Sequence, residues 1–95
     1  MSDPLRVDIQ VVESRANPGA TAHRDRWFVK CRIVQVLTGK LSRTTLTLLI
    51  HSPTKSFATA IDDLPDYIFT LDLLDPMTDL YSGRFNVIGK RPVES

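Results

Sequence analysis

The chain has few residues that could act as a nucleophile or as a general base. Nucleophilic catalysis needs a Ser or Cys beside a base and an orienting third group, and the candidates are Cys31, Ser52, His23 and His51. Cys31 alternates with apolar residues, which predicts a small buried side chain. Ser52 precedes Pro53 and is predicted to start a turn. No G-x-S-x-G motif is present in the sequence, so we expect no catalytic residue and no enzymatic activity.

Three acidic residues surround a predicted turn and could collect a weakly bound cation. Asp72, Asp75 and Asp79 lie in and just before the sequence DPMTD. They lack the alternating Asp or Asn positions, the central Gly and the terminal Glu of a calcium-binding loop. We therefore expect no metal ion, and we expect no other cofactor.

A cationic surface with one aromatic side chain is predicted in the middle of the chain. Phe28, Lys30 and Arg32 are two residues apart, so in a strand they share one face. The next strand and the preceding loop would add Thr45, Thr47 and His51, and Arg15, His23, Arg24 and Arg26. An aromatic residue in a cationic groove is typical of single-stranded nucleic-acid binding. The acidic DPMTD turn would oppose this function, because it would repel phosphates.

A second surface is predicted to be apolar. Val34, Val36 and Leu49 occupy positions on the outer side of the same two strands. Contiguous exposed apolar residues mark docking surfaces. We expect this patch to bind a protein partner or a second copy of the chain, unless a terminus or a loop covers it.

The charge is nearly balanced overall but uneven along the chain. The net charge is +1; residues 1–55 hold nine Lys and Arg against four acidic residues, and residues 56–95 hold three against seven. The two halves therefore carry about +5 and −4. Such a dipole could orient a charged partner, or the two halves could simply attract one another.

The pattern of apolar residues predicts strands with one short helix. Leu5, Val7, Ile9 and Val11 alternate with polar residues, as in a half-buried strand. Residues 14–25 read as a loop, and Gly39 marks a turn. The predicted strands are 5–13, 26–37, 44–51, 66–74 and 80–90, and the predicted helix is 54–65, with Phe57 and Ile61 facing the core.

This order of elements predicts an all-β fold in one domain, residues 1–95. Five strands with a helix between the third and fourth match an OB-like, five-stranded Greek-key barrel. The segments CRIVQVLTGK and HSPTKSFATAIDDLPDYIFTLD also resemble the netrin-like module, the OB-fold domain of tissue inhibitors of metalloproteinases. The resemblance implies a small binding or accessory barrel. The chain lacks the disulfides of that family and the N-terminal cysteine that chelates zinc, so inhibition of metalloproteinases is not implied.

From the sequence we expect a non-catalytic module that binds a protein partner or associates with itself. The alternative is an OB-fold that binds single-stranded nucleic acid on the outer face of its second and third strands. No small-molecule substrate is evident. No apolar run approaches the roughly 20 residues that span a bilayer, so no membrane association is expected. One Cys and no export signal predict a cytoplasmic location, or a secreted one if a leader has been removed.

Overall fold

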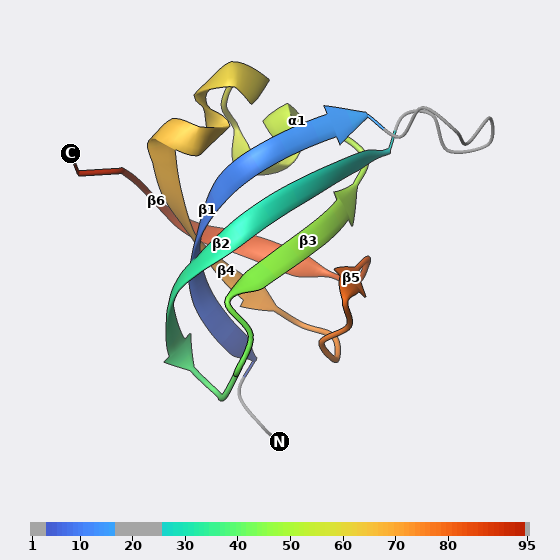
Figure 1. Ribbon diagram of the computed structural model, residues 1–95, viewed down its shortest axis with the longest axis vertical. Helices are drawn as coiled ribbons and strands as arrows, with labels where there is room; N and C mark the ends of the chain where they lie inside the picture. Colours follow the sequence, from blue (N-terminus) through green and yellow to red (C-terminus); the bar gives the residue numbers. More distant parts are fainter. Residues whose placement is uncertain (1–3, 17–25, 95) are drawn as a thin grey trace.

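The computed structural model describes residues 4–16 and 26–94, which form a mostly β structure (Figure 1). The predicted all-β class is confirmed. The elements are β1 (Leu5–Ala16), β2 (Trp27–Thr38), β3 (Thr45–Ile50), α1 (Pro53–Phe57), the 3-10 helix η1 (Ile61–Asp66), β4 (Tyr67–Leu73), β5 (Leu80–Tyr81) and β6 (Phe85–Pro92). None of the described helices is long and apolar enough to cross a membrane.

The strands form a single six-stranded sheet in the order β5-β3-β2-β1-β4-β6. All neighbours are antiparallel except β3 and β5, which run parallel over two residue pairs. The sheet is strongly curved, so that β4 and β6 lie behind β1 to β3 in Figure 1. The predicted five-stranded barrel is therefore wrong in strand number, and the six-stranded sheet is not closed, with β5 and β6 at the two ends of the strand order.

The predicted strand 80–90 is divided because the chain turns sharply at residues 82–84. A Cβ atom at Gly83 would lie only 2.7 Å from Cβ of Asp75, so this close approach requires glycine. Before the turn, Tyr81 pairs with Leu48 of β3; after it, Phe85 pairs with Leu73 of β4. One short stretch of chain therefore supplies both end strands of the sheet.

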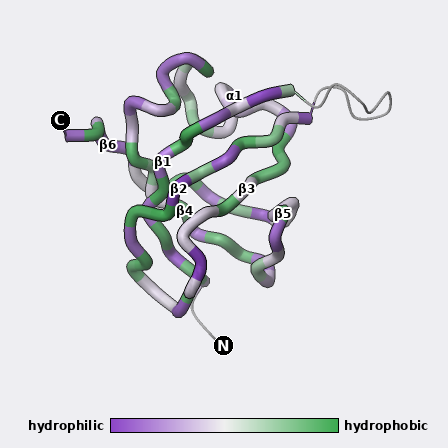
Figure 2. Tube along the Cα trace, viewed as in Figure 1, coloured by the Kyte–Doolittle hydropathy of each residue, from purple (hydrophilic) through white to green (hydrophobic). Residues whose placement is uncertain are grey.

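The core lies on the concave face of the sheet and follows the predicted alternation. Hydrophobic and hydrophilic residues alternate along β1 and β2 in Figure 2. On β4, the alternate residues Phe69, Leu71 and Leu73 are buried. The other buried apolar residues are Val7, Ile9, Val11, Val29, Cys31, Leu46, Leu48, Ile50, Phe57, Leu64 and Tyr81.

A β-bulge in β2 reverses the inward and outward directions along its second half. Val34 is an extra residue between the partners of Asp8 and Ile9. An extra residue shifts the period-2 pattern by one position, so the side chains that follow change face as far as Leu37, where a second register shift occurs. As a result Gln35 is exposed, whereas Val36 packs against the core.

This bulge contradicts the predicted apolar patch of Val34, Val36 and Leu49. Val36 points inward, and Leu49 pairs with Phe28 near the opposite end of β2. Eight residues separate Phe28 from Val36, which is about 26 Å along a strand. The three residues therefore do not form one surface.

The predicted helix 54–65 is two shorter helices. Ala58 adopts a left-handed conformation with φ of 54° and ends α1, and η1 begins three residues later. Phe57 is buried as predicted and packs against Phe69, with ring centroids 4.6 Å apart and the ring planes tilted by 49°. Ile61 is only half-buried, so just one of the two expected core residues of this segment is fully buried.

The first predicted strand ends too early, because β1 continues to Ala16. This extension places Arg15, which was expected in a loop, on a strand opposite Phe28. His23 and Arg24 lie outside the described residues.

Candidate functional site

The register of β2 and β3 brings the predicted cationic residues together on the convex face. Arg32 is opposite Thr45, and Lys30 is opposite Thr47. We call the surface formed by Phe28, Lys30, Arg32, Thr45 and Thr47 the β2–β3 face. Lys30, Arg32 and Thr45 are exposed, and Phe28 and Thr47 are half-buried.

A first hollow of about 230 Å³ lies on this face. It is lined by Phe28, Lys30 and Thr47, together with Glu13 and Arg15 of β1. The β1–β2 register shifts at Val12, and as a result Glu13 lies opposite Lys30 and Arg15 lies opposite Phe28. Sequence reasoning missed Glu13, because the shift cannot be read from the period-2 pattern of β1 alone.

The cations of this region have no carboxylate partner among the described residues. No ion pair within the described chain involves Arg15, Lys30 or Arg32, although Glu13 stands opposite Lys30. Arg32 Nη2 donates a hydrogen bond to Oε1 of Gln10 at 3.0 Å, which orients the guanidinium without neutralising it. The region therefore presents positive charge beside one aromatic ring, with Glu13 as an exposed acidic residue among the cations.

The other predicted members of the face lie at its margins. His51 is exposed and directly follows β3. Arg26 directly precedes β2 and is half-buried, and its Nε is buried with no hydrogen-bond partner among the described residues. Arg26 and His51 therefore lie at the ends of β2 and β3, but neither residue lines the first hollow.

The potential nucleophiles have structural surroundings. Cys31 is fully buried, and its burial raises the pKa of the thiol. Ser52 precedes α1, its carbonyl accepts a hydrogen bond from the Ser56 amide, and its Oγ lies 3.3 Å from Oγ1 of Thr54. Ser52 is therefore a turn and helix-start residue in the structure.

Each of the three aspartates around the DPMTD turn is paired with a different arginine. Asp72 binds Arg6, and Asp79 binds Arg43, each at 2.7 Å. The side-chain hydrogen bond from Arg6 lowers the pKa of Asp72. No group of three metal-ligating side chains occurs in the described parts of the chain.

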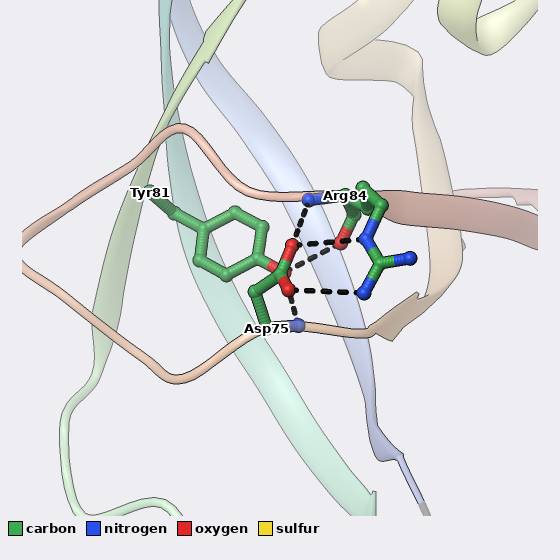
Figure 3. Close-up of polar contacts among 3 residues, drawn as sticks. All are labelled: Asp75, Tyr81 and Arg84. Atoms are coloured by element: carbon green, nitrogen blue, oxygen red, sulfur yellow. Dashed lines mark hydrogen bonds and ion pairs between the residues drawn. The ribbon is translucent and has the colours of Figure 1, made fainter.

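The third aspartate, Asp75, organises the turn after β4 (Figure 3). Its carboxylate accepts hydrogen bonds from the backbone amide of Arg84 at 2.6 Å and from Nη2 of the same residue at 3.2 Å. These bonds lower the pKa of Asp75. The Asp75 amide donates to the Tyr81 hydroxyl, which donates to the Arg84 carbonyl. The negative charge of this turn is therefore matched locally by arginine.

A buried carboxylate on the convex face was not anticipated from the sequence. Asp8 is 1% exposed and accepts hydrogen bonds from Nη2 of Arg91 at 2.8 Å, from Nε2 of Gln35 at 2.9 Å and from the Thr70 hydroxyl. Its burial opposes ionisation, but the bonds from Arg91, Thr70 and Gln35 outweigh that effect and lower the pKa of Asp8.

The netrin-like resemblance predicted from the sequence rests on the segments around Gly39, Phe57–Leu64 and Tyr67–Phe69. Gly39 does occupy a turn that favours glycine, with φ of 90°. The other two segments are a pair of short helices and the start of β4. No known protein family, curated protein or solved structure matches the chain.

Proposed function

We propose that this chain is an OB-like module that binds single-stranded nucleic acid on the β2–β3 face. The observation that carries the proposal is the first hollow, where the Phe28 ring lies beside Arg15 and Lys30, neither of which has an ion-pair partner in the described chain. A base can stack on the ring, while the cations bind phosphates on either side of it. Thr45 and Thr47 offer hydroxyl groups for hydrogen bonds on the same face.

The strand connections support an OB-like architecture for this proposal. OB-folds are partly open Greek-key barrels. Here β1 lies between β2 and β4, and β3 has a parallel neighbour in β5. The segment of residues 80–92 supplies the end strand beside β3 and the end strand beside β4. These connections support a partly open, OB-like arrangement of the curved sheet, with the turn at residues 82–84 between its two end strands.

The acidic DPMTD turn, which would oppose nucleic-acid binding by repelling phosphates, is largely neutralised in the structure. Asp75 and Asp79 would repel phosphates if they were unpaired. Their ion pairs with Arg84 and Arg43 offset this charge. The turn therefore presents little net negative charge to a bound strand.

A protein partner, the function we expected first, has less support from the surface. The predicted apolar patch is divided by the bulge, and Val36 packs against the core. The exposed large apolar residues of the described chain are Val12, Leu37, Leu74, Leu80 and Ile88, and they come from different elements. Single exposed apolar residues are ordinary on protein surfaces.

Fluorescence anisotropy with a labelled single strand of about 12 nucleotides tests the proposal, since OB-folds cover about 4–16 nucleotides. The wild type should bind saturably at low salt. Phe28→Ala should weaken binding by roughly 5- to 150-fold, because stacking contributes about 1–3 kcal/mol per base. Lys30→Gln should also weaken it, whereas the exposed Lys55→Gln on α1 serves as a matched control. Equal affinities of the Lys30 and Lys55 variants, or no binding by the wild type, would contradict the proposal.

A further inference from the structure

A second cationic hollow adjoins the β2–β3 face on its far side. One row of outward residues crosses four strands, because Arg32 pairs with Gln10, Gln10 pairs with Ile68, and Ile68 pairs with Arg91. A hollow of about 380 Å³ lies on this row and is lined by Arg32, Ile68, Arg91, Pro92, Val93 and Glu94. Two arginines from strands that are not neighbours therefore line one depression, with an apolar side chain between them.

Both guanidinium groups are held in place from one end. Arg32 donates from Nη2 to Gln10, and Gln10 in turn donates to the Pro65 carbonyl at 3.0 Å. Arg91 donates from Nη2 to the buried carboxylate of Asp8 at 2.8 Å. A guanidinium has five N–H donors, so each arginine keeps further donors for a ligand. Fixed guanidinium groups bind phosphate with less loss of side-chain entropy than mobile ones.

The second hollow is continuous with the β2–β3 face through β2. Arg32 belongs to both, and Lys30 is two residues away on the same side of the strand, about 7 Å along it. A strand of nucleic acid that stacks on Phe28 and passes Lys30 would therefore place its next phosphates over Arg32. From there the phosphates can reach the Arg91 side of the hollow.

We propose that the hollow between Arg32 and Arg91 is a phosphate-binding subsite. In this inference, which rests on the proposed function, the subsite extends the nucleic-acid path from β2 across β1 and β4 to β6. Arg32 and Arg91 supply N–H donors to phosphate oxygens, and Ile68 forms the floor. Asp8 acts as a positioning residue, because it holds Arg91 without facing the ligand.

Glu94 gives this inference a distinctive signature. Glu94 also lines the hollow, and its negative charge would repel a phosphate there. Removing that charge should therefore strengthen binding at this subsite alone. Replacing Arg91 by Lys keeps a positive charge near Asp8 but loses the planar fork that binds phosphate with two N–H groups.

The first test compares the binding of two single-stranded oligonucleotides, one of about four and one of about ten nucleotides. Both lengths are within the range of site sizes for one OB-fold. For the longer strand, Arg91→Lys should weaken binding by about tenfold, equivalent to ~1.4 kcal/mol, and Glu94→Gln should strengthen it. The shorter strand fits on the β2–β3 face, so neither variant should change its affinity. Unchanged affinity of the longer strand in both variants would overturn the subsite while leaving the proposed function intact.

A second measurement does not depend on nucleic-acid binding. Inorganic phosphate is titrated into labelled protein, and the side-chain Nε–H resonances of arginine are followed by NMR. The subsite predicts saturable shifts of Arg32 and Arg91 that are larger in Glu94→Gln, with Arg43 as an internal control that binds Asp79. Equal shifts of all three arginines, or shifts reproduced by chloride, would overturn the subsite. Saturable shifts without any binding of the strands would keep the phosphate site and remove the nucleic-acid function.

Discussion

The carboxylate of Asp8 combines burial with charge. It is 1% exposed, and Arg91, Gln35 and Thr70 donate hydrogen bonds to it from two other strands and from the end strand β6. Because these bonds lower the pKa of Asp8 below its unfolded value of about 3.9, the ionised form stabilises the fold. That contribution is complete above the unfolded pKa and is lost as the pH falls through the lower folded pKa.

Replacing this carboxylate should change both stability and its dependence on pH. Asp8→Asn should lower the free energy of unfolding near pH 7 by about 1–3 kcal/mol, because charge-assisted hydrogen bonds become neutral ones. It should also remove part of the loss that the wild type shows below about pH 4. Urea unfolding at several pH values measures both effects, and the exposed Asp62→Asn is the control. A variant with the same acid profile as the wild type would refute this account of Asp8.

The direction and burial of a side chain could be predicted from the sequence only where they depend on neighbours within the same strand. The outward side of Lys30 and the burial of Cys31 follow from the alternation along one strand. For Asp8 the same alternation predicts solvent, since its partners Gln35, Thr70 and Arg91 are 27, 62 and 83 residues away. The network depends on which strands are neighbours, and no pattern within β1 carries that information.

At the scale of elements, irregular positions limited the prediction more than the strands did. Every predicted strand exists in part, because β-branched and apolar residues alternate strongly enough to specify it. The extra residue Val34 in β2, the turn at Gly83 and the left-handed Ala58 each divide or shift an element. No pattern within a single strand marks these positions. The predicted patch at Val36 was therefore wrong, because it lies beyond the extra residue Val34. Lys30 and Arg32 lie before that residue, and they share one face as predicted.

The break between α1 and η1 offers a stabilising substitution. Ala58 ends α1 with φ of 54°, where an alanine side chain is strained and glycine is not. Ala58→Gly should therefore raise the free energy of unfolding by up to about 1 kcal/mol. Ala60→Gly is the matched control, because Ala60 has φ of −68°, and the substitution there should only destabilise. Thermal unfolding decides the matter, and a loss of stability in both variants would show that Ala58 is not strained.

At the scale of the whole molecule, the basic and acidic halves of the chain lie side by side in one sheet. The strands of the basic half, β1, β2 and β3, are adjacent in the sheet, and the strands of the acidic half lie on either side of them, with β4 next to β1 and β5 next to β3. Ion pairs such as Arg6 with Asp72 and Arg43 with Asp79 join the two halves. The unequal charges therefore attract one another across the sheet. In the described chain, Arg15, Lys30 and Arg32 keep positive charge without an ion pair on the convex face.

This distribution predicts that salt weakens binding strongly and changes stability little. Each phosphate that a cation neutralises on a single strand contributes about −0.7 to the slope of log affinity against log salt. With Arg15, Lys30 and Arg32 engaged, the slope should be about −2, and with Arg91 engaged it should approach −3. Raising salt from ~50 to ~200 mM should thus weaken binding by about 20- to 50-fold. The melting temperature should change little over this range, because exposed ion pairs contribute at most about 1 kcal/mol each.

Two variants separate the contribution of charge from that of stacking. Lys30→Gln should reduce the slope by about 0.7, whereas Phe28→Ala should lower affinity and leave the slope unchanged. A slope near zero would instead favour an apolar protein partner, because that association does not release counterions.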